Sequence, residues 1–390
     1  MTEDPMSGST KLSGLARLSA HTIRDYSANP VAKYPDDIPW CAEALTPQWL
    51  TPVLCSQVQN AVVRAVAVED ASTGSSVRKR IGVTYNDAGQ RAGLKTKFFA
   101  KTTPTILTRL TSGPSAAQES NFFARIRPAL DIETPTHIYS ANDRISGRSI
   151  HLFEDLVDTV EATFCDYRTT FGEAQLAGAF NLLARLHGHF FGAPELESEH
   201  GWIPSYPVFF DALARTGTRD GHEQARNEAR HLIPDRVADN WQKLWPAAVA
   251  GRNQHNDYPQ CVIHSDLHPG NWYLTGSSEP GLCDWQCIAR GLWARDFAYA
   301  MSTLVDVAER RSCEYDVLKN YLQALYDAGG PQLNFEEAKA LYHSQLPGVL
   351  LMWTPTLCHP ATMPDMQPED VSMEMIHRIT TAIDDHGVIE

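Results

Sequence analysis

The sequence of 390 residues lacks the features that mark several large classes of protein. It contains no run of about twenty apolar residues, so no membrane-spanning helix is expected. It has no basic excess, because 33 Lys and Arg stand against 47 Asp and Glu, a formal net charge of −14. Nucleic-acid backbones attract basic surfaces, and the acidic balance therefore argues against a nucleic-acid partner. We find no internal repeat and no low-complexity tract.

The eight cysteines form no C-x-x-C pair and no disulfide framework, which favours a reduced, cytoplasmic protein. Five Cys and His residues that cluster in the sequence could instead hold zinc, although their spacings fit no usual zinc motif. They are Cys261, His264, His268, Cys283 and Cys287.

The first thirty residues are polar, are interrupted by Gly, Ser and Pro, and lack the apolar stretch of a signal peptide. We expect residues 1–30 to be a flexible tail or an arm laid on the surface.

One octapeptide carries the chemistry of an enzyme. Residues 264–271 read His-Ser-Asp-Leu-His-Pro-Gly-Asn, and Asp284 follows thirteen residues after Asn271. Phosphoryl transfer from a nucleotide needs a base or orienting group for the incoming hydroxyl, and oxygen ligands for Mg²⁺. Asp266 can accept the hydroxyl proton. Asn271 and Asp284 can hold the metal, because Mg²⁺ prefers hard oxygen donors.

The surroundings of the octapeptide support this interpretation. The apolar runs 261–263 and 281–283 predict short buried strands, and 271–274 with the turn after it predicts a hairpin. The octapeptide aligns with the protein-kinase catalytic loop H-R-D-L-x-x-x-N, with Ser265 at the Arg position. His268 lies where protein kinases have a phosphate-contacting Lys, so it either donates to the γ-phosphate or packs.

These residues resemble the aminoglycoside phosphotransferase and choline-kinase-like family of small-molecule kinases, including its ecdysteroid-kinase-like branch. The family pattern continues with Asp-Trp or Asp-Phe-Gln and then Asp-Leu/Phe-Ala, which are Asp284-Trp-Gln and Asp296-Phe-Ala here. The resemblance covers about residues 45–385. It implies an α+β, protein-kinase-like two-lobed fold, with a small antiparallel-sheet lobe over 31–156 and a larger, mainly helical lobe over 157–390.

The smaller lobe fits the order of elements that the residues predict. Alternating or apolar residues favour three strands, at 61–69, 78–85 and 94–101. The small-residue loop before the second strand has only Gly74 of a G-x-G-x-x-G motif. The backbone N–H groups of Ser75 and Ser76 could still cradle phosphate.

The resemblance also assigns the nucleotide site. Lys101, at the end of the third strand, is the candidate for the nucleotide phosphates, and Glu119 is expected to ion-pair with it. The alternative for each is an ordinary exposed side chain. The segment around Glu154 and Leu156 resembles the hinge whose backbone binds the adenine edge. The implied cofactors are ATP, with GTP also possible, and Mg²⁺.

The larger lobe is predicted to be helical, with an apolar stripe over 173–190 that contains a structural His187. His264 is expected to pin the catalytic loop, and the resemblance implies that Asp296 accepts backbone N–H groups from this loop.

We therefore predict an ATP-dependent phosphotransferase that acts on a small-molecule hydroxyl. A protein kinase and an inactive nucleotide-binding protein are the alternatives; eleven residues between Asp284 and Asp296 are too few for an activation segment. The aromatic residues of 196–260 and Trp272, Trp285, Trp293 and Trp353 favour an acceptor with apolar surface, whereas the acidic balance allows a polycation.

Overall fold

The computed structural model describes residues 6–73, 76–111, 113–360 and 366–389. The chain divides into two compact units, which are described separately. Unit 1 comprises Met1–Ala124 and Pro135–Glu161, and unit 2 comprises Arg125–Thr134 and Ala162–Glu390. The short segment 125–134 groups with unit 2, and the expected lobe ranges 31–156 and 157–390 stay predictions.

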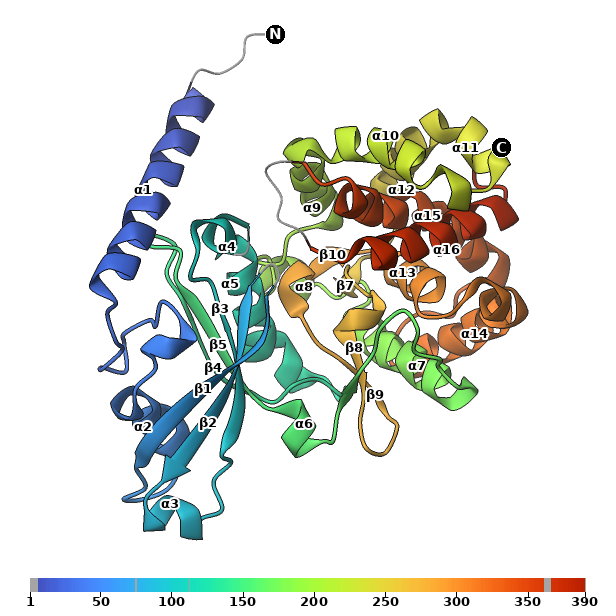
Figure 1. Ribbon diagram of the computed structural model, residues 1–390. Coiled ribbons are helices and arrows are strands. Elements are labelled where there is room, and N and C mark those ends of the chain that lie inside the picture. Colours follow the sequence, from blue (N-terminus) through green and yellow to red (C-terminus); the bar gives the residue numbers. More distant parts are fainter. Residues whose placement is uncertain (1–5, 74–75, 112, 361–365, 390) are drawn as a thin grey trace. The chain divides into compact units, whose positions relative to one another are not determined.

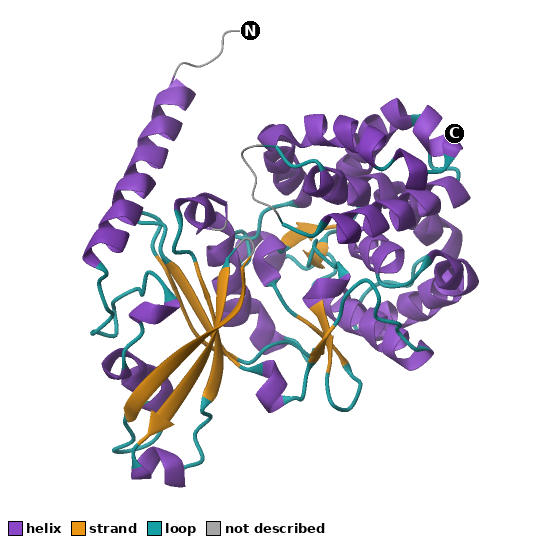
Figure 2. Cartoon of the chain, in the orientation of Figure 1, coloured by secondary structure: helices purple, strands orange, loops and turns teal. Residues whose placement is uncertain are grey.

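Unit 1 is built on a five-stranded antiparallel sheet with the order β1-β2-β3-β5-β4, shown in orange in Figure 2. The strands are β1 (Val63–Thr73), β2 (Val77–Tyr85), β3 (Lys97–Thr102), β4 (His137–Asn142) and β5 (Ser149–Glu154). The three strands expected from the sequence are present with shifted ends. The predicted α+β class, with an antiparallel sheet in the N-terminal part, is confirmed.

The two faces of this sheet carry different residues because successive side chains point to opposite sides. Ala100 and Leu152 belong to a buried apolar cluster with Trp49 of α2 (Pro47–Cys55). Their neighbours Lys101 and His151, paired across β3 and β5, lie on the other face. The sheet thus separates an apolar core from a polar row.

Side-chain caps explain where two of the helices near this sheet begin. The Thr46 hydroxyl accepts the Trp49 N–H (3.1 Å) at the start of α2, as its position before Pro47 predicts. The Asn86 side chain accepts the Gly89 N–H (3.2 Å) and begins α3 (Asp87–Arg91). The remaining helices of unit 1 are α4 (Ile106–Thr111), α5 (Gly113–Asn121) and α6 (Leu156–Thr159).

Of the two expectations for residues 1–30, a flexible tail or an arm laid on the surface, the described part of that range favours the arm. Met6–Ala28 form helix α1 (Figure 1), and its Asp25 is buried. Asp25 Oδ2 accepts from Arg109 Nη2 (2.6 Å) and Arg148 Nε (3.0 Å). Two arginines from distant parts of unit 1 therefore fasten the C-terminal end of α1.

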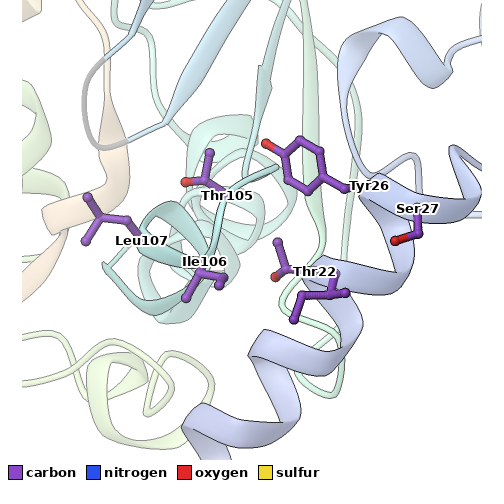
Figure 3. Close-up of a pocket in the computed structure, with 7 residues that line it drawn as sticks. Thr22, Tyr26, Ser27, Thr105, Ile106 and Leu107 are labelled. Atoms are coloured by element: carbon purple, nitrogen blue, oxygen red, sulfur yellow. The ribbon is translucent and has the colours of Figure 1, made fainter.

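A surface cavity of about 480 Å³ lies beside α1 in unit 1 (Figure 3). It is lined by residues of α1 and of the start of α4, which are Thr22, Ile23, Tyr26, Ser27, Thr105, Ile106 and Leu107. None of the residues that the sequence assigns to chemistry lines it. The cavity therefore gives no support to the predicted site.

Unit 2 is mainly helical, as predicted for the C-terminal part (Figure 2). Its strands form two small antiparallel sheets, one of β6 (Thr163–Phe164), β8 (Trp272–Leu274) and β9 (Pro280–Leu282), and one of β7 (Cys261–Ile263) and β10 (Ala289–Gly291). The helices are α7 (Glu173–His189), α8 (Glu195–Ser198), α9 (Tyr206–Leu213), α10 (Arg219–Glu228), α11 (Asp235–Asp239), α12 (Leu244–Gln254), α13 (Trp293–Thr303), α14 (Val307–Asp327), α15 (Phe335–Leu357) and α16 (Glu369–Asp385).

The aromatic residues of unit 2 mostly serve its core. Trp272, Trp285, Trp293 and Trp353 are each buried, as are Tyr206, Phe210 and Trp241 of the segment 196–260. Ordinary packing accounts for these residues, whereas Trp202, Phe209 and Trp245 of the same segment are half-buried, so an acceptor with apolar surface stays a prediction. Among the described residues, no helix combines the length and the apolar character that crossing a membrane requires.

Replacement of Asp25 by Ala should lower the free energy of unfolding of the protein by about 3–5 kcal/mol, because the buried Arg109 loses its charge partner. Chemical denaturation of both proteins measures this difference. Asp70→Ala is the control, because Asp70 pairs with Lys79 at an exposed site and should change stability by less than about 1 kcal/mol. A loss in D25A no larger than that in D70A would contradict the anchoring role.

The same contact predicts a pH dependence. Burial opposes ionisation of Asp25, but hydrogen bonds and charge from Arg148 and Arg109 outweigh it and hold its pKa below the ordinary 3.8. A carboxyl with a depressed folded-state pKa stabilises the fold above its unfolded pKa and loses this contribution as pH falls through the folded one. The stability difference between wild type and D25A should therefore be constant near neutral pH and shrink below about pH 4. Denaturation at several pH values measures it.

Candidate active site

The predicted catalytic loop connects β7 to β8 in unit 2. Its backbone is unusual, because Ser265 has φ +69° and Asp284, which follows β9, has φ +63°. Both values lie in the left-handed region, which non-glycine residues rarely adopt. Six non-glycine residues among the described ones have positive φ, and two of them belong to this site. Such strain persists where the surrounding structure imposes it.

The Asp266 carboxylate is held from two sides. Its Oδ1 accepts from the Tyr299 hydroxyl (3.1 Å), and its Oδ2 accepts from Asn271 Nδ2 (3.3 Å). Asn271 Nδ2 also donates to the backbone oxygen of Asp266 (2.8 Å). The carboxylate is about one-quarter exposed. The loop therefore fixes the orientation of this carboxylate while leaving part of it accessible.

A hairpin brings Asp284 to the same end of the fold as Asn271. β8 and β9 pair Trp272 with Leu282, and the Cys283 N–H donates to the backbone oxygen of Asn271 (2.9 Å). Asp284 directly follows Cys283, so the two predicted metal ligands flank one pair of hydrogen-bonded strand ends. The hairpin was predicted from the sequence.

Asp296, fully buried at the start of α13, organises the loop. Its Oδ2 accepts the His264 N–H (2.6 Å) and its Oδ1 the Ser265 N–H (2.9 Å). His187 Nε2 lies 3.2 Å from Oδ2. Burial would raise the pKa of Asp296, but the hydrogen bond and charge of His187, with the backbone N–H of His264, hold it below its usual value. The expected support by Asp296 and the structural place of His187 are confirmed.

His264 is neutral in this setting. Its Nδ1 accepts the Asp266 N–H (3.3 Å) and its Nε2 lies 3.0 Å from the carbonyl oxygen of Cys283, so Nε2 carries the proton. Burial lowers the pKa of His264. Both ring nitrogens are thus engaged, which confirms a pinning residue rather than a base.

His268 lies beside Asp266. Its Nε2 is 4.0 Å from Asp266 Oδ2, and its Nδ1 accepts the Gly270 N–H (3.1 Å). The ring also contacts Trp353 edge-on, with centroids 5.9 Å apart. These contacts leave Nε2 available on the side of the carboxylate, which fits either role that the sequence left open.

The predicted nucleotide residues belong to unit 1. Lys101 Nζ donates to both carboxylate oxygens of Glu119 (3.0 and 2.8 Å), so the expected ion pair is present, and both side chains are buried. Their alternative reading as exposed side chains is wrong. His151 Nε2 lies 4.0 Å from Glu119 Oε2.

The other predicted nucleotide contacts are less complete. Ser75 lies outside the described residues. Ser76 is buried, and its hydroxyl has no hydrogen-bond partner within the described ranges. The Glu154 N–H donates to the backbone oxygen of Thr136 (3.0 Å), and Leu156 begins α6 after its cap Asp155. The Glu154 N–H is therefore already used, and Leu156 stays a prediction for the adenine edge.

Tyr299 is the site residue that sequence reasoning missed. Its signal was its place three residues after Asp296 on α13, which puts both side chains on one face of the helix. No group of three or more His, Cys, Asp or Glu within the described ranges is arranged to hold a metal ion. Cys261 Sγ instead contacts the backbone oxygen of Gly291 (3.4 Å).

The sequence matches the model of the phosphotransferase enzyme family over residues 94–335. The chain belongs to this family. The predicted family and the predicted enzyme class, a small-molecule kinase, are thereby confirmed. The matched range contains Lys101 and the whole loop from His264 to Asp296.

Solved structures similar to this phosphotransferase share little sequence with it. A choline kinase from Streptococcus pneumoniae is 14% identical (TM-score 0.46; 83% of this chain and 94% of that one covered). An ethanolamine kinase from Plasmodium vivax is 10% identical (TM-score 0.49; 90% of each chain covered). A putative aminoglycoside phosphotransferase from Ralstonia eutropha is 12% identical (TM-score 0.48; 86% and 97% covered). Comparison with curated proteins gives no match.

Asp296→Ala should lower the free energy of unfolding by about 3–5 kcal/mol, because two buried backbone N–H groups and His187 lose their acceptor. Urea denaturation of the phosphotransferase measures the loss. Asp316→Ala, which breaks an exposed pair with Lys319, should cost less than about 1 kcal/mol. Equal stability of the two variants would show that Asp296 does not organise the loop.

Proposed function

We propose that this phosphotransferase transfers the γ-phosphate of ATP to a hydroxyl group of a small molecule, with Asp266 as the base. The observation that supports this most is the arrangement of Asp266 beside Asn271 within one strained loop, with Asp284 at the adjoining strand end. Phosphoryl transfer depends mainly on positioning and charge neutralisation, and a loop held this firmly suits that task.

Asn271 and Asp284 are the proposed ligands of Mg²⁺. Their donor set fits a hard cation, because an amide oxygen and a carboxylate are oxygen donors and two protein ligands leave positions for phosphate oxygens and water. The Asn271 amide nitrogen is engaged with Asp266, which leaves its oxygen for the cation. When bound, Mg²⁺ would neutralise charge on the phosphates.

Asp266 receives the proton of the acceptor hydroxyl in this proposal. Its pKa need not approach that of an alcohol, because in a loose transition state the proton leaves late. The fixed carboxylate orients the hydroxyl toward the phosphorus. His268, 4.0 Å from Asp266, is placed to donate to a phosphate oxygen from the same side.

Lys101 is the proposed contact of the nucleotide phosphates, held by Glu119 in unit 1. The backbone of Ser75 and Ser76 and the segment at Glu154 and Leu156 complete the proposed nucleotide contacts. ATP is the expected donor, and GTP is tested beside it.

The identity of the acceptor is open, because the buried tryptophans belong to the core and an acceptor with apolar surface stays a prediction. A protein acceptor is disfavoured. The eleven residues between Asp284 and Asp296 include a 3₁₀ turn, Trp285–Cys287, and strand β10, so no activation segment fits there. A screen of hydroxyl compounds that includes choline, aminoglycosides, sugars and hydroxysteroids, read by ATP and GTP consumption, tests the acceptor class. An inactive nucleotide-binding protein would bind Mg²⁺-ATP without consuming it.

Asp266→Ala and Asp284→Ala should each lower turnover by about 10³-fold or more without unfolding the protein, because one removes the base and the other a metal ligand. Rates of ADP formation and thermal melting measure both effects. Asp257→Ala, at an exposed position of unit 2, is the matched control and should keep wild-type turnover. Wild-type turnover in D266A or D284A would overturn the proposal.

Lys101→Met should raise the KM for ATP by about 10-fold or more, because an ammonium group leaves the proposed phosphate site. The buried Glu119 is then unpaired, so the double variant K101M/E119Q, which removes both charges, separates the nucleotide effect from loss of stability. Lys97→Met, at a mostly exposed position of β3, is the control. Initial rates over a range of ATP concentrations measure this KM. An unchanged KM for ATP in the double variant would show that Lys101 does not contact the nucleotide.

A further inference from the structure

Three side chains of helix α13 hydrogen-bond to the catalytic loop, and they are Asp296, Tyr299 and Thr303. Asp296 holds the backbone N–H groups of His264 and Ser265. Tyr299, three residues later and therefore on the same face of the helix, reaches the side chain of Asp266. One helix face thus contacts both the backbone and the carboxylate of the loop.

The Tyr299 hydroxyl is a hydrogen-bond donor to Asp266. It lies 3.1 Å from Asp266 Oδ1, while Asn271 occupies Oδ2. Tyr299 is almost fully buried, and burial raises its pKa well above the usual value, so the phenol keeps its proton. A neutral donor beside a carboxylate forms a charge-assisted hydrogen bond, which is stronger than one between neutral groups.

Arg295 packs against the ring of Tyr299 and restricts its movement. Its guanidinium carbon lies 4.9 Å from the centroid of the Tyr299 ring and 5.3 Å from that of Tyr206, and its Nε donates to the Tyr206 hydroxyl (2.8 Å). Arg295 is fully buried, and neither terminal nitrogen has an acceptor among the described residues. The two aromatic rings are thus the main compensation for this charge.

The energetic consequence is that Arg295 and Tyr299 stabilise one another's position. A buried guanidinium without carboxylate partners is costly to move away from the rings that it contacts. The Tyr299 ring in turn has little freedom to rotate its hydroxyl away from Asp266. Such preorganisation is what a base needs when it must meet a hydroxyl within hydrogen-bond distance.

We propose that Tyr299, held in place by Arg295, is a positioning residue that fixes the Asp266 carboxylate for acceptance of the hydroxyl proton. This inference rests on the proposed function, in which Asp266 is the base. It assigns to α13 a part in the reaction that goes beyond support of the loop backbone. Without the Tyr299 hydroxyl, the Asp266 carboxylate would rotate more freely about its bond to Cβ. It would then be correctly oriented toward the acceptor hydroxyl for a smaller fraction of the time.

Tyr299→Phe tests the inference, because it removes one oxygen and keeps the ring. The assay is ADP release from Mg²⁺-ATP with water as the acceptor hydroxyl, which needs no cognate substrate. We expect kcat to fall about 10- to 100-fold, the KM for ATP to change less than about 2-fold, and the melting temperature to fall no further than it does when Tyr342 loses its hydroxyl. A merely structural tyrosine would lower the melting temperature without lowering kcat.

Two further variants make the test specific. Tyr342→Phe removes the hydroxyl of an equally buried tyrosine that donates to Glu314, and it should keep the wild-type kcat. In the Asp266→Ala background, measured under single-turnover conditions, Tyr299→Phe should cost nothing more, because it acts through Asp266. Arg295→Met should lower kcat, and its effect should not add to that of Y299F.

The outcomes separate this inference from the function on which it rests. If the wild type releases ADP no faster than D266A, the proposed function fails. If the wild type is faster than D266A but Y299F matches the wild type, or Y299F costs as much in D266A as in the wild type, the positioning role alone is wrong.

Discussion

The hydrogen bonds from His264 and Ser265 to the Asp296 carboxylate are the constraint on which the site depends. They hold two consecutive N–H groups on one buried anion, and this is compatible with the left-handed conformation of Ser265. The next residue is Asp266, so the direction of its side chain follows from this backbone geometry. His187 and Tyr321, whose hydroxyl lies 2.7 Å from His187 Nδ1, extend the network into the helical core. A buried polar network of this kind is stable when its members are satisfied.

Much of this was predictable from the sequence because the relevant interactions are local. The spacing from His264 to Asn271 and on to Asp284 places all three in one loop and hairpin, and the apolar runs on either side predict their strands. The family pattern continues from Asp284 to Asp296 in the same part of the sequence. The Lys101–Glu119 pair was also expected, but from the resemblance to the kinase family, which assigns the two residues together. Short sequence separation leaves few alternative arrangements.

What the sequence did not reveal depends on contacts between distant residues. Nothing near Asp25 indicates that Arg109 and Arg148 will bury it, so the first thirty residues do not decide between a flexible tail and an arm laid on the surface. Only its place three residues after Asp296 set Tyr299 apart from an ordinary core tyrosine, since its hydroxyl finds Asp266 across 33 positions of chain. The tryptophans suggested a binding surface because composition reports aromatic content and not burial. Partner choice at such distances is set by tertiary packing.

The fastening of α1 has a consequence for biosynthesis. Asp25 precedes Arg148 by 123 positions, so the ribosome must add all of them before both arginines exist. At about 5–20 residues per second this takes roughly 6 to 25 s. Arg109 is made earlier, 84 positions after Asp25, so one of the two ion pairs can form before the other. The anchoring of α1, which packs against α4, is therefore complete only after Arg148 has been synthesised.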